Sequence, residues 1–220
     1  MGLDIAIKIC GLSTSAHAIA AVEAGVDMIG LMFAPSRRQV SPKQAAMLTE
    51  AVRSYQRHMS VEKRVSFVGV FVNEDVAHMA SIADYCGLDS IQLSGDEDVS
   101  IVGRLPNQYD VIKAIRLTDA VTERQWLTID RQVRFLVDAH VANSYGGSGV
   151  TADWAKAAIV AQQHEILLAG GLSSTNVAEA VRVVHPWGVD VSSGVESNGI
   201  KDAAKIRSFV ATARTMSGSL

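Results

Sequence analysis

The chain has 220 residues, of which 48% are hydrophobic and 20% charged, so it can bury a full core and does not have the composition of a disordered chain. Its net charge is −3, and no run of basic residues is longer than the pair Arg37-Arg38, which argues against a nucleic-acid partner. Two cysteines do not make a disulfide framework in a chain of this size. Since neither a signal peptide nor a membrane-length apolar run is apparent, we expect a cytoplasmic protein with reduced thiols and no membrane partner.

The first apolar run, residues 5–10, stops at Gly11 and predicts a short buried strand. Residues 13–15, Ser-Thr-Ser, can cap the helix that follows. The strand therefore ends in Cys10, which faces a helix start at the strand end where α/β proteins bind ligands. From its position alone, Cys10 can be a small buried hydrophobe or a functional thiol.

Seven more short apolar runs follow, at residues 28–33, 65–72, 90–93, 111–115, 134–138, 166–169 and 189–192. Helical patterns lie between the runs, at 14–24, 42–57, 75–86, 118–128, 153–163, 175–184 and 202–213. The pattern at 118–128 is the least periodic of them. Strands that alternate with helices in this way predict either a closed (β/α)8 barrel or a doubly wound sheet.

The near-equal strand spacing and the lack of a long polar break favour a single (β/α)8 TIM barrel domain over residues 1–220. A doubly wound nucleotide-binding sheet should carry a glycine-rich turn directly after an early strand. The one loose match, Gly147-x-Gly149-x-x-Ala152, instead lies in a loop beyond the sixth strand. We therefore expect the α/β barrel.

The loops after the seventh and eighth strands are the most informative, because they carry Gly170-Gly171 and Ser193-Gly194. In phosphate-binding barrels these two loops hold a phosphate through backbone N–H groups. Glycine lets the backbone approach the phosphate oxygens, and serine adds a hydroxyl donor. Phosphate binding is favoured here over two ordinary turns.

Other strand ends offer charged groups whose role stays open. Asp138 ends the sixth strand and is either a functional acid or a cap of the next loop. That loop, residues 139–150, is rich in glycine and is either a mobile lid or a plain connector. Arg38, after the second strand, can bind a carboxylate or simply be solvated. The histidines show no ligand spacing, so no metal site is expected.

Six strings in order along nearly the whole chain resemble one enzyme family, the phosphoribosylanthranilate isomerases: Lys8-Ile9-Cys10-Gly11-Leu12, Gly69-Val70-Phe71-Val72-Asn73, Gln92-Leu93, Tyr145-Gly146-Gly147-Ser148-Gly149, Ala169-Gly170-Gly171-Leu172 and Asp190-Val191-Ser192-Ser193-Gly194-Val195-Glu196. The resemblance implies a (β/α)8 barrel of tryptophan biosynthesis. It implies conversion of N-(5-phosphoribosyl)anthranilate into 1-(2-carboxyphenylamino)-1-deoxyribulose 5-phosphate, an Amadori rearrangement that needs no cofactor.

The resemblance also implies a role for each site residue. Cys10 is the expected general base and Asp138 the expected general acid. The expected substrate-binding residues are Arg38 for the anthranilate carboxylate, the glycine loops for the phosphate, and also Gln92, Gly170, Gly171, Asp190, Ser193 and Gly194. Ring opening needs a protonated Asp138, which an apolar strand end would favour. The iminium that forms acidifies C2 of the sugar, so a Cys10 thiolate is a sufficient base.

Three positions depart from the family pattern. Ser94 stands where the family usually has His, Ala152 stands where an aromatic residue is common, and Ser173-Ser174 replace Asn-Pro. Three alternatives therefore stay open: a related phosphate barrel such as the histidine-pathway isomerase or an epimerase, an altered enzyme acting on another phosphosugar, and a silent binding or assembly module. The first strand's Cys and the lack of a Gly-Gly loop in the first half argue against the histidine-pathway enzyme. We expect a small phosphosugar substrate and a monomer or homodimer.

Overall fold

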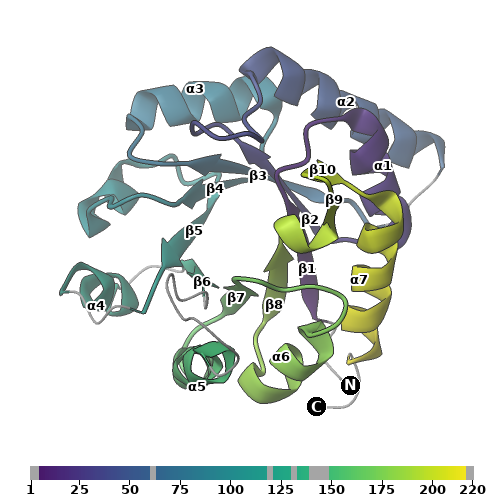
Figure 1. Ribbon diagram of the computed structural model, residues 1–220. Helices are drawn as coiled ribbons and strands as arrows, with labels where there is room; N and C mark the ends of the chain where they lie inside the picture. The colour runs from purple at the N-terminus through teal and green to yellow at the C-terminus, as the bar shows by residue number, and fades with distance from the viewer. Residues whose placement is uncertain (1–4, 60–62, 118–120, 130–132, 139–148, 217–220) are drawn as a thin grey trace.

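A closed barrel of eight parallel strands, in the order β1 to β8, forms the centre of the computed structural model (Figure 1). The structure describes residues 5–59, 63–117, 121–129, 133–138 and 149–216. The strands are β1 (Ala6–Cys10), β2 (Met28–Met32), β3 (Ser66–Phe71), β4 (Ser90–Leu93), β5 (Asp110–Ile115), β6 (Arg134–Asp138), β7 (Ile166–Ala169) and β8 (Gly188–Val191). The barrel closes where β1 pairs with β8, in a register that sets Lys8 opposite Asp190. All eight predicted strands are confirmed, with each boundary within one residue of the prediction.

Helices surround the barrel on the outside (Figure 1). They are α1 (Ser15–Ala24), α2 (Pro42–His58), α3 (Val76–Cys86), α4 (Val121–Leu127), α5 (Gly149–Ala161), α6 (Val177–Val184) and α7 (Ala203–Thr215). Between β4 and β5 the connection is a 3-10 helix, η1 (Val99–Arg104), in place of an α-helix. Its segment contains Gly103 and is followed by Pro106, and both residue types limit helix length.

Between β8 and α7 the chain forms a 3-10 turn, η2 (Ser193–Val195), and then a small hairpin. The hairpin pairs β9 (Glu196–Ser197) with β10 (Ile200–Lys201). It brings two charged side chains, Glu196 and Lys201, back toward the β1 side of the barrel, as the contacts below show. The sequence analysis did not predict this hairpin.

The expected caps form where polar residues precede the helices. Thr14 accepts a hydrogen bond from the N–H of His17 at the start of α1. Ser41 and Gln44 exchange side-chain and backbone hydrogen bonds in a capping box at the start of α2, with Pro42 in the first turn. These caps satisfy N–H groups that the helix itself leaves unpaired, and so fix where α1 and α2 begin.

The strands alternate between two apolar layers. Inside the barrel, Met28, Val68, Ile112, Leu136, Leu167 and Ala169 pack together. The opposite strand faces, with Ile7, Ile9 and Phe67 among them, pack beneath the helices. Since side chains alternate along a strand, Ala6, Lys8 and Cys10 share the face of β1 that looks into the barrel. Within the described ranges, no helix combines the length and apolarity needed to cross a membrane.

Candidate active site

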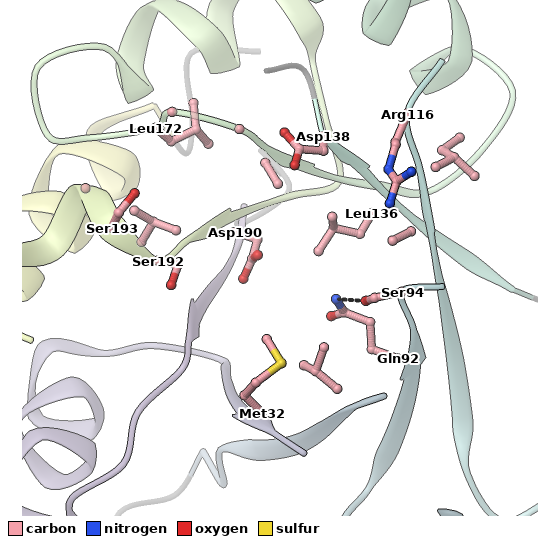
Figure 2. Close-up of a pocket in the computed structure, with 18 of the residues that line it drawn as sticks. Met32, Gln92, Ser94, Arg116, Leu136, Asp138, Leu172, Asp190, Ser192 and Ser193 are labelled. Carbon is pink, nitrogen blue, oxygen red and sulfur yellow. Dashed lines mark hydrogen bonds between the residues drawn. The ribbon is translucent and has the colours of Figure 1, made fainter. Parts of the chain in front are cut away.

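A cavity of about 450 Å³ opens at the carboxyl ends of the strands (Figure 2). Apolar side chains such as Met32 and Leu136 form its floor and walls, and polar groups enter from several strand ends. Seven of the nine predicted site residues line it: Gln92, Asp138, Gly170, Gly171, Asp190, Ser193 and Gly194. The barrel thus brings together residues from β4, β6, β7 and β8, as expected for a site at this face.

Cys10 lies next to this cavity and is not among the residues that line it. It is the last residue of β1 and is only 6% exposed. On one side it pairs in register with Gly30 of β2, and a Cβ on that glycine would lie 3.0 Å from the sulfur. On the other side, the Ser192 hydroxyl donates to the Cys10 carbonyl oxygen at 3.1 Å. The thiol therefore faces Gly30 of β2, and the backbone of Cys10 is fixed to the segment after β8.

A lysine that the sequence analysis assigned no role lies directly below Cys10. Lys8 is fully buried, and its Nζ donates to Oδ1 of Asp190 at 2.9 Å. Asp190 lines the cavity, so this ion pair connects the cavity wall with the barrel interior. The only signal in the sequence is a lysine in the middle of an otherwise apolar strand.

Burial raises the pKa of the Cys10 thiol above its usual value. The positive charge of Lys8 and its hydrogen bond to the sulfur act in the opposite direction, as does the charge of Lys201, while the charge of Asp190 raises the pKa further. Burial thus disfavours the Cys10 thiolate. Its use as a base depends on the cations around it.

Arg38, the predicted carboxylate ligand, also lies beside the cavity and is held in a fork by Glu196. Its Nε donates to Oε1 at 2.6 Å and its Nη2 to Oε2 at 3.1 Å. Lys201 and Arg37 contact the same carboxylate at 3.0 Å and 2.6 Å. Burial opposes the charge of Glu196, but the hydrogen bonds from Arg38 and Lys201 lower its pKa to about 2. Glu196 therefore orients Arg38 as a permanent anion.

The first strand leaves room for Arg38 because it is followed by glycine. A Cβ on Gly11 would lie 2.5 Å from Cδ of Arg38, and the positive φ of 75° at Gly11 is itself unfavourable for other residues. The glycine after Cys10 thus lets the arginine side chain lie across the end of β1. Gly11 thus allows the Arg38 side chain to lie near Cys10.

Asp138 is exposed at the end of β6 and does not sit in the apolar surroundings that the sequence analysis expected. Figure 2 shows its carboxylate on the same side of the cavity as the guanidinium of Arg116, which follows β5. The carboxylate lines the cavity, where it can meet a ligand.

Gln92 enters the cavity from β4 and connects it to Ser94, the position where the family usually has His. Its Nε2 donates to the Ser94 hydroxyl at 3.0 Å (Figure 2). Among the described residues, nothing donates to its buried Oε1. A buried acceptor of this kind is costly unless a ligand or water supplies a donor, which fits a sugar-binding role.

The loops after β7 and β8 touch each other. Gly170 and Gly171 have φ values of 89° and 65°, which bend the first loop sharply. A Cβ on Gly194 in the second loop would lie 1.8 Å from the Leu172 carbonyl oxygen, so no other residue fits there. Lys201 adds a positive charge, because its Nζ donates to the Ser192 carbonyl at 2.8 Å. Two adjoining glycine turns with a nearby cation suit a phosphate.

The glycine-rich string at 145–149 lies outside the described residues, apart from Gly149, where α5 begins. The predicted loop at 139–150 is therefore described only for its last two residues, and these belong to the helix. In the part of the chain that the structure describes, His, Cys, Asp and Glu form no cluster that could hold a metal ion.

Comparisons with known proteins identify the family. The family model described as N-(5'phosphoribosyl)anthranilate (PRA) isomerase matches residues 7–212. An N-(5'-phosphoribosyl)anthranilate isomerase of Roseiflexus sp. (strain RS-1) is 57% identical, covering 96% of this chain and 98% of the relative. The solved phosphoribosyl anthranilate isomerase of Thermotoga maritima is 34% identical with a TM-score of 0.80, covering 96% and 99% of the two chains.

A further solved isomerase was crystallised in complex with reduced 1-(O-carboxyphenylamino)-1-deoxyribulose 5-phosphate. It is 31% identical to this chain with a TM-score of 0.78, again covering 96% of this chain and 99% of the other. These matches confirm both the barrel and the resemblance that the sequence strings indicated. The chain belongs to the N-(5'-phosphoribosyl)anthranilate isomerase family.

Proposed function

We propose that this member of the family converts N-(5-phosphoribosyl)anthranilate into 1-(2-carboxyphenylamino)-1-deoxyribulose 5-phosphate in tryptophan biosynthesis, with Cys10 as general base and Asp138 as general acid. The observation that carries this proposal is the cavity at the strand ends. On one side it has the joined glycine turns, and on another the Asp138 carboxylate, while Asp190, which lines it, is paired with Lys8 beside Cys10. The glycine turns and the proposed acid thus meet at a space of ligand size, with the proposed base next to it.

The reaction divides into a ring opening and a proton shift from C2 to C1. Asp138 gives a proton to the ribose ring oxygen as the bond from that oxygen to C1 breaks, and the anilino nitrogen lone pair forms an iminium with C1. The Cys10 thiolate then takes the proton from C2, and the electrons of that C–H bond neutralise the iminium to give an enol-amine. A proton then returns from the Cys10 thiol to C1, and the C2 hydroxyl gives its proton to the Asp138 carboxylate, so that C2 becomes the ketone and both groups regain their starting protonation. No electrons leave the substrate, so the chemistry requires no cofactor.

Substrate binding divides among the strand ends. The turns at Gly170-Gly171 and Ser193-Gly194 bind the phosphate through backbone N–H groups, with Lys201 nearby as a positive charge. Arg38, oriented by Glu196, binds the anthranilate carboxylate at the cavity edge. Gln92 and Asp190 accept hydrogen bonds from the sugar hydroxyls. In each case the residue type suits the charge or polarity of the substrate group that it meets.

The test is a coupled assay that starts from anthranilate, phosphoribosyl pyrophosphate and the preceding transferase, and follows the loss of phosphoribosylanthranilate fluorescence. We expect turnover by the natural chain, and a loss of about 10²–10⁴-fold in Cys10→Ala and in Asp138→Asn. Cys86→Ala is the matched control, since this second buried thiol donates only to the Pro42 carbonyl beneath α2 and should leave turnover intact. Unchanged turnover in both site variants would overturn the assigned roles. Absence of turnover in the natural chain would leave a binding module or a different phosphosugar as substrate.

The remaining expectations are part of the same proposal. The chain works as one barrel unit in the cytoplasm, where both cysteines stay reduced, and both are free thiols in the structure. Its partners are the small phosphosugar and, at most, a second copy of itself.

A further inference from the structure

The barrel interior contains a charged side chain that the reaction scheme does not use. Lys8 is fully buried inside the barrel, with Asp190 as its ion-pair partner at 2.9 Å. Removing an ammonium and a carboxylate from water is expensive, and apolar side chains of similar volume usually stabilise a core as well or better. Packing alone therefore does not account for an ion pair at this place.

Lys8 shares its surroundings with the Cys10 sulfur. Both face Gly30 of β2, where an added Cβ would lie 3.0 Å from the sulfur and 3.2 Å from Nζ of Lys8. Gly30 thus leaves a common space that ammonium and sulfur both border. The charge of Lys8 and its hydrogen bond to the sulfur both lower the thiol pKa.

Charged groups face Cys10 from four elements. Lys8 belongs to β1 and Asp190 to β8, while Lys201 belongs to β10 and Arg38 to the segment between β2 and α2. Glu196 neutralises part of the last two charges through its contacts with both. Lys8 is the only one of the three cations that lies on the strand of the thiol, and its partner Asp190 opens into the cavity.

We propose that Lys8 is a positioning residue for the base: its ammonium holds the negative charge of the Cys10 thiolate, and Asp190 fixes the ammonium beside the sulfur. Lys8 keeps its proton throughout, and the proton from C2 of the substrate moves to sulfur alone. This inference rests on the proposed role of Cys10 as base. Burial opposes the charge of Lys8, but Asp190 and Cys10 outweigh it and raise the pKa of the lysine.

The test reads the Cys10 thiolate directly, by its ultraviolet absorbance during a pH titration. The background is Cys86→Ala, so that Cys10 is the single thiol, and a Cys10→Ser protein supplies the baseline. We expect Lys8→Met to raise the Cys10 pKa by about 1–3, the range for loss of a close opposite charge. We expect Asp190→Asn to lower it, because a negative charge disappears and the thiolate becomes the counter-ion of Lys8.

The opposite signs distinguish an electrostatic role from a structural one. If the lysine only filled space, loosening of the barrel would move both variants in the same direction, toward the pKa of an exposed thiol. Lys113→Met is the matched control, because it breaks a second buried Lys–Glu pair away from Cys10 and should leave the titration unchanged. A Cys10 pKa that does not rise in folded Lys8→Met, or does not fall in Asp190→Asn, overturns the proposal. Should Lys8→Met fail to fold, the Asp190→Asn titration decides by itself.

Turnover gives a second readout. In Lys8→Met the rising limb of the pH profile of kcat/KM should move to higher pH by the same amount as the thiol titration. The rate at neutral pH should fall about 10- to 1000-fold and recover at alkaline pH, which a rigid-packing role does not predict. The two proposals fail separately. Full activity of Cys10→Ala removes the base assignment, whereas the absorbance titration tests Lys8 whatever the turnover.

Discussion

Of the buried lysine–carboxylate pairs among the described residues, two lie on opposite faces of the barrel sheet. Lys8 and Asp190 meet at 2.9 Å inside the barrel, and Lys113 and Glu97 meet at 2.7 Å between the barrel and its helices. Lys113 faces outward because its neighbours Ile112 and Ala114 pack in the inner layer. The pairs share their chemistry and differ in what surrounds them.

The outer pair is closed by backbone groups. One Glu97 oxygen accepts the N–H of Asn73 and of Gly95, both at 2.9 Å, and Lys113 also donates to the Gly95 carbonyl. The indole of Trp126 donates to the Glu97 carbonyl and lies 5.4 Å from the ammonium. Every partner is a loop or a helix, so this pair fastens the turns after β3 and β4. The inner pair, Lys8–Asp190, instead contacts the Cys10 thiol and the cavity. Of these two pairs, it is therefore the one that can act on a bound substrate.

The largest expected effect is on stability, from Lys113→Met. It leaves Glu97 buried without its cation, which typically lowers the free energy of unfolding by about 3–5 kcal/mol. Urea unfolding measures the loss. Turnover per folded molecule should stay at the level of the natural chain. Reduced turnover in fully folded protein would contradict the separation of the two pairs.

Two glycines, one beside each pair, sharpen the comparison further. A Cβ at Gly95 would lie 2.3 Å from the Asn73 amide oxygen and 2.8 Å from its backbone N, so Gly95→Ala should cost about 1–3 kcal/mol of stability, with only a minor effect on turnover. A Cβ at Gly30 meets the Cys10 sulfur and Lys8 less closely, at 3.0 Å and 3.2 Å. Gly30→Ala should therefore lower the stability less than Gly95→Ala does, and lower the turnover more. Thermal unfolding measures the loss of stability in both variants, and the fluorescence assay measures their loss of turnover. If the ratio of lost turnover to lost stability were the same in Gly95→Ala and Gly30→Ala, the prediction would be wrong.

The smallest effect is the acid dependence of stability. Burial alone would raise the pKa of Glu97, but the hydrogen bonds from Lys113 and from the N–H of Asn73 outweigh it and lower that pKa below its ordinary 4.5. A lowered pKa in the folded state contributes stability above the unfolded-state value and loses it as pH falls through the folded-state value. Urea unfolding at about pH 5 and about pH 3 should show a fall in stability that is smaller in Glu97→Gln. An identical fall in the two proteins would show that the outer pair has no part in it.

The fold was predictable because buried parallel strands are continuous apolar runs, and eight of them alternate with helical patterns. The position of residues at strand ends was predictable for the same reason, since Asp138, Gly170 and Gly171 line the cavity as expected. Between the fourth and fifth strands, where no helical pattern was assigned, the connection is the short η1.

Contacts that arise only on closure could not be predicted. Lys8 meets Asp190 across 182 positions of sequence, and Arg38 meets Glu196 across 158. In the sequence, Lys8 only interrupts an apolar pattern, and its partner becomes visible when β1 pairs with β8. Arg38 has the pattern of a solvated arginine, and its partner Glu196 is brought to it by the β9–β10 hairpin. The contact of Ser94 likewise could not be predicted, because its hydroxyl accepts a hydrogen bond from the Gln92 side-chain amide only in the folded strand end.

The last helix is tied to the first strand. Arg214 of α7 donates to the Ile5 carbonyl and to the Asp27 carboxylate, and α1 packs beside α7 (Figure 1). During synthesis on the ribosome, β1 is made first and can meet β2 early, whereas its second neighbour β8 and the helix α7 are made last. A nascent chain that stops short of β8 leaves Lys8 without its anion and Cys10 without its charged surroundings. Competence for proton transfer thus comes late in translation, when the closing elements of the barrel are complete.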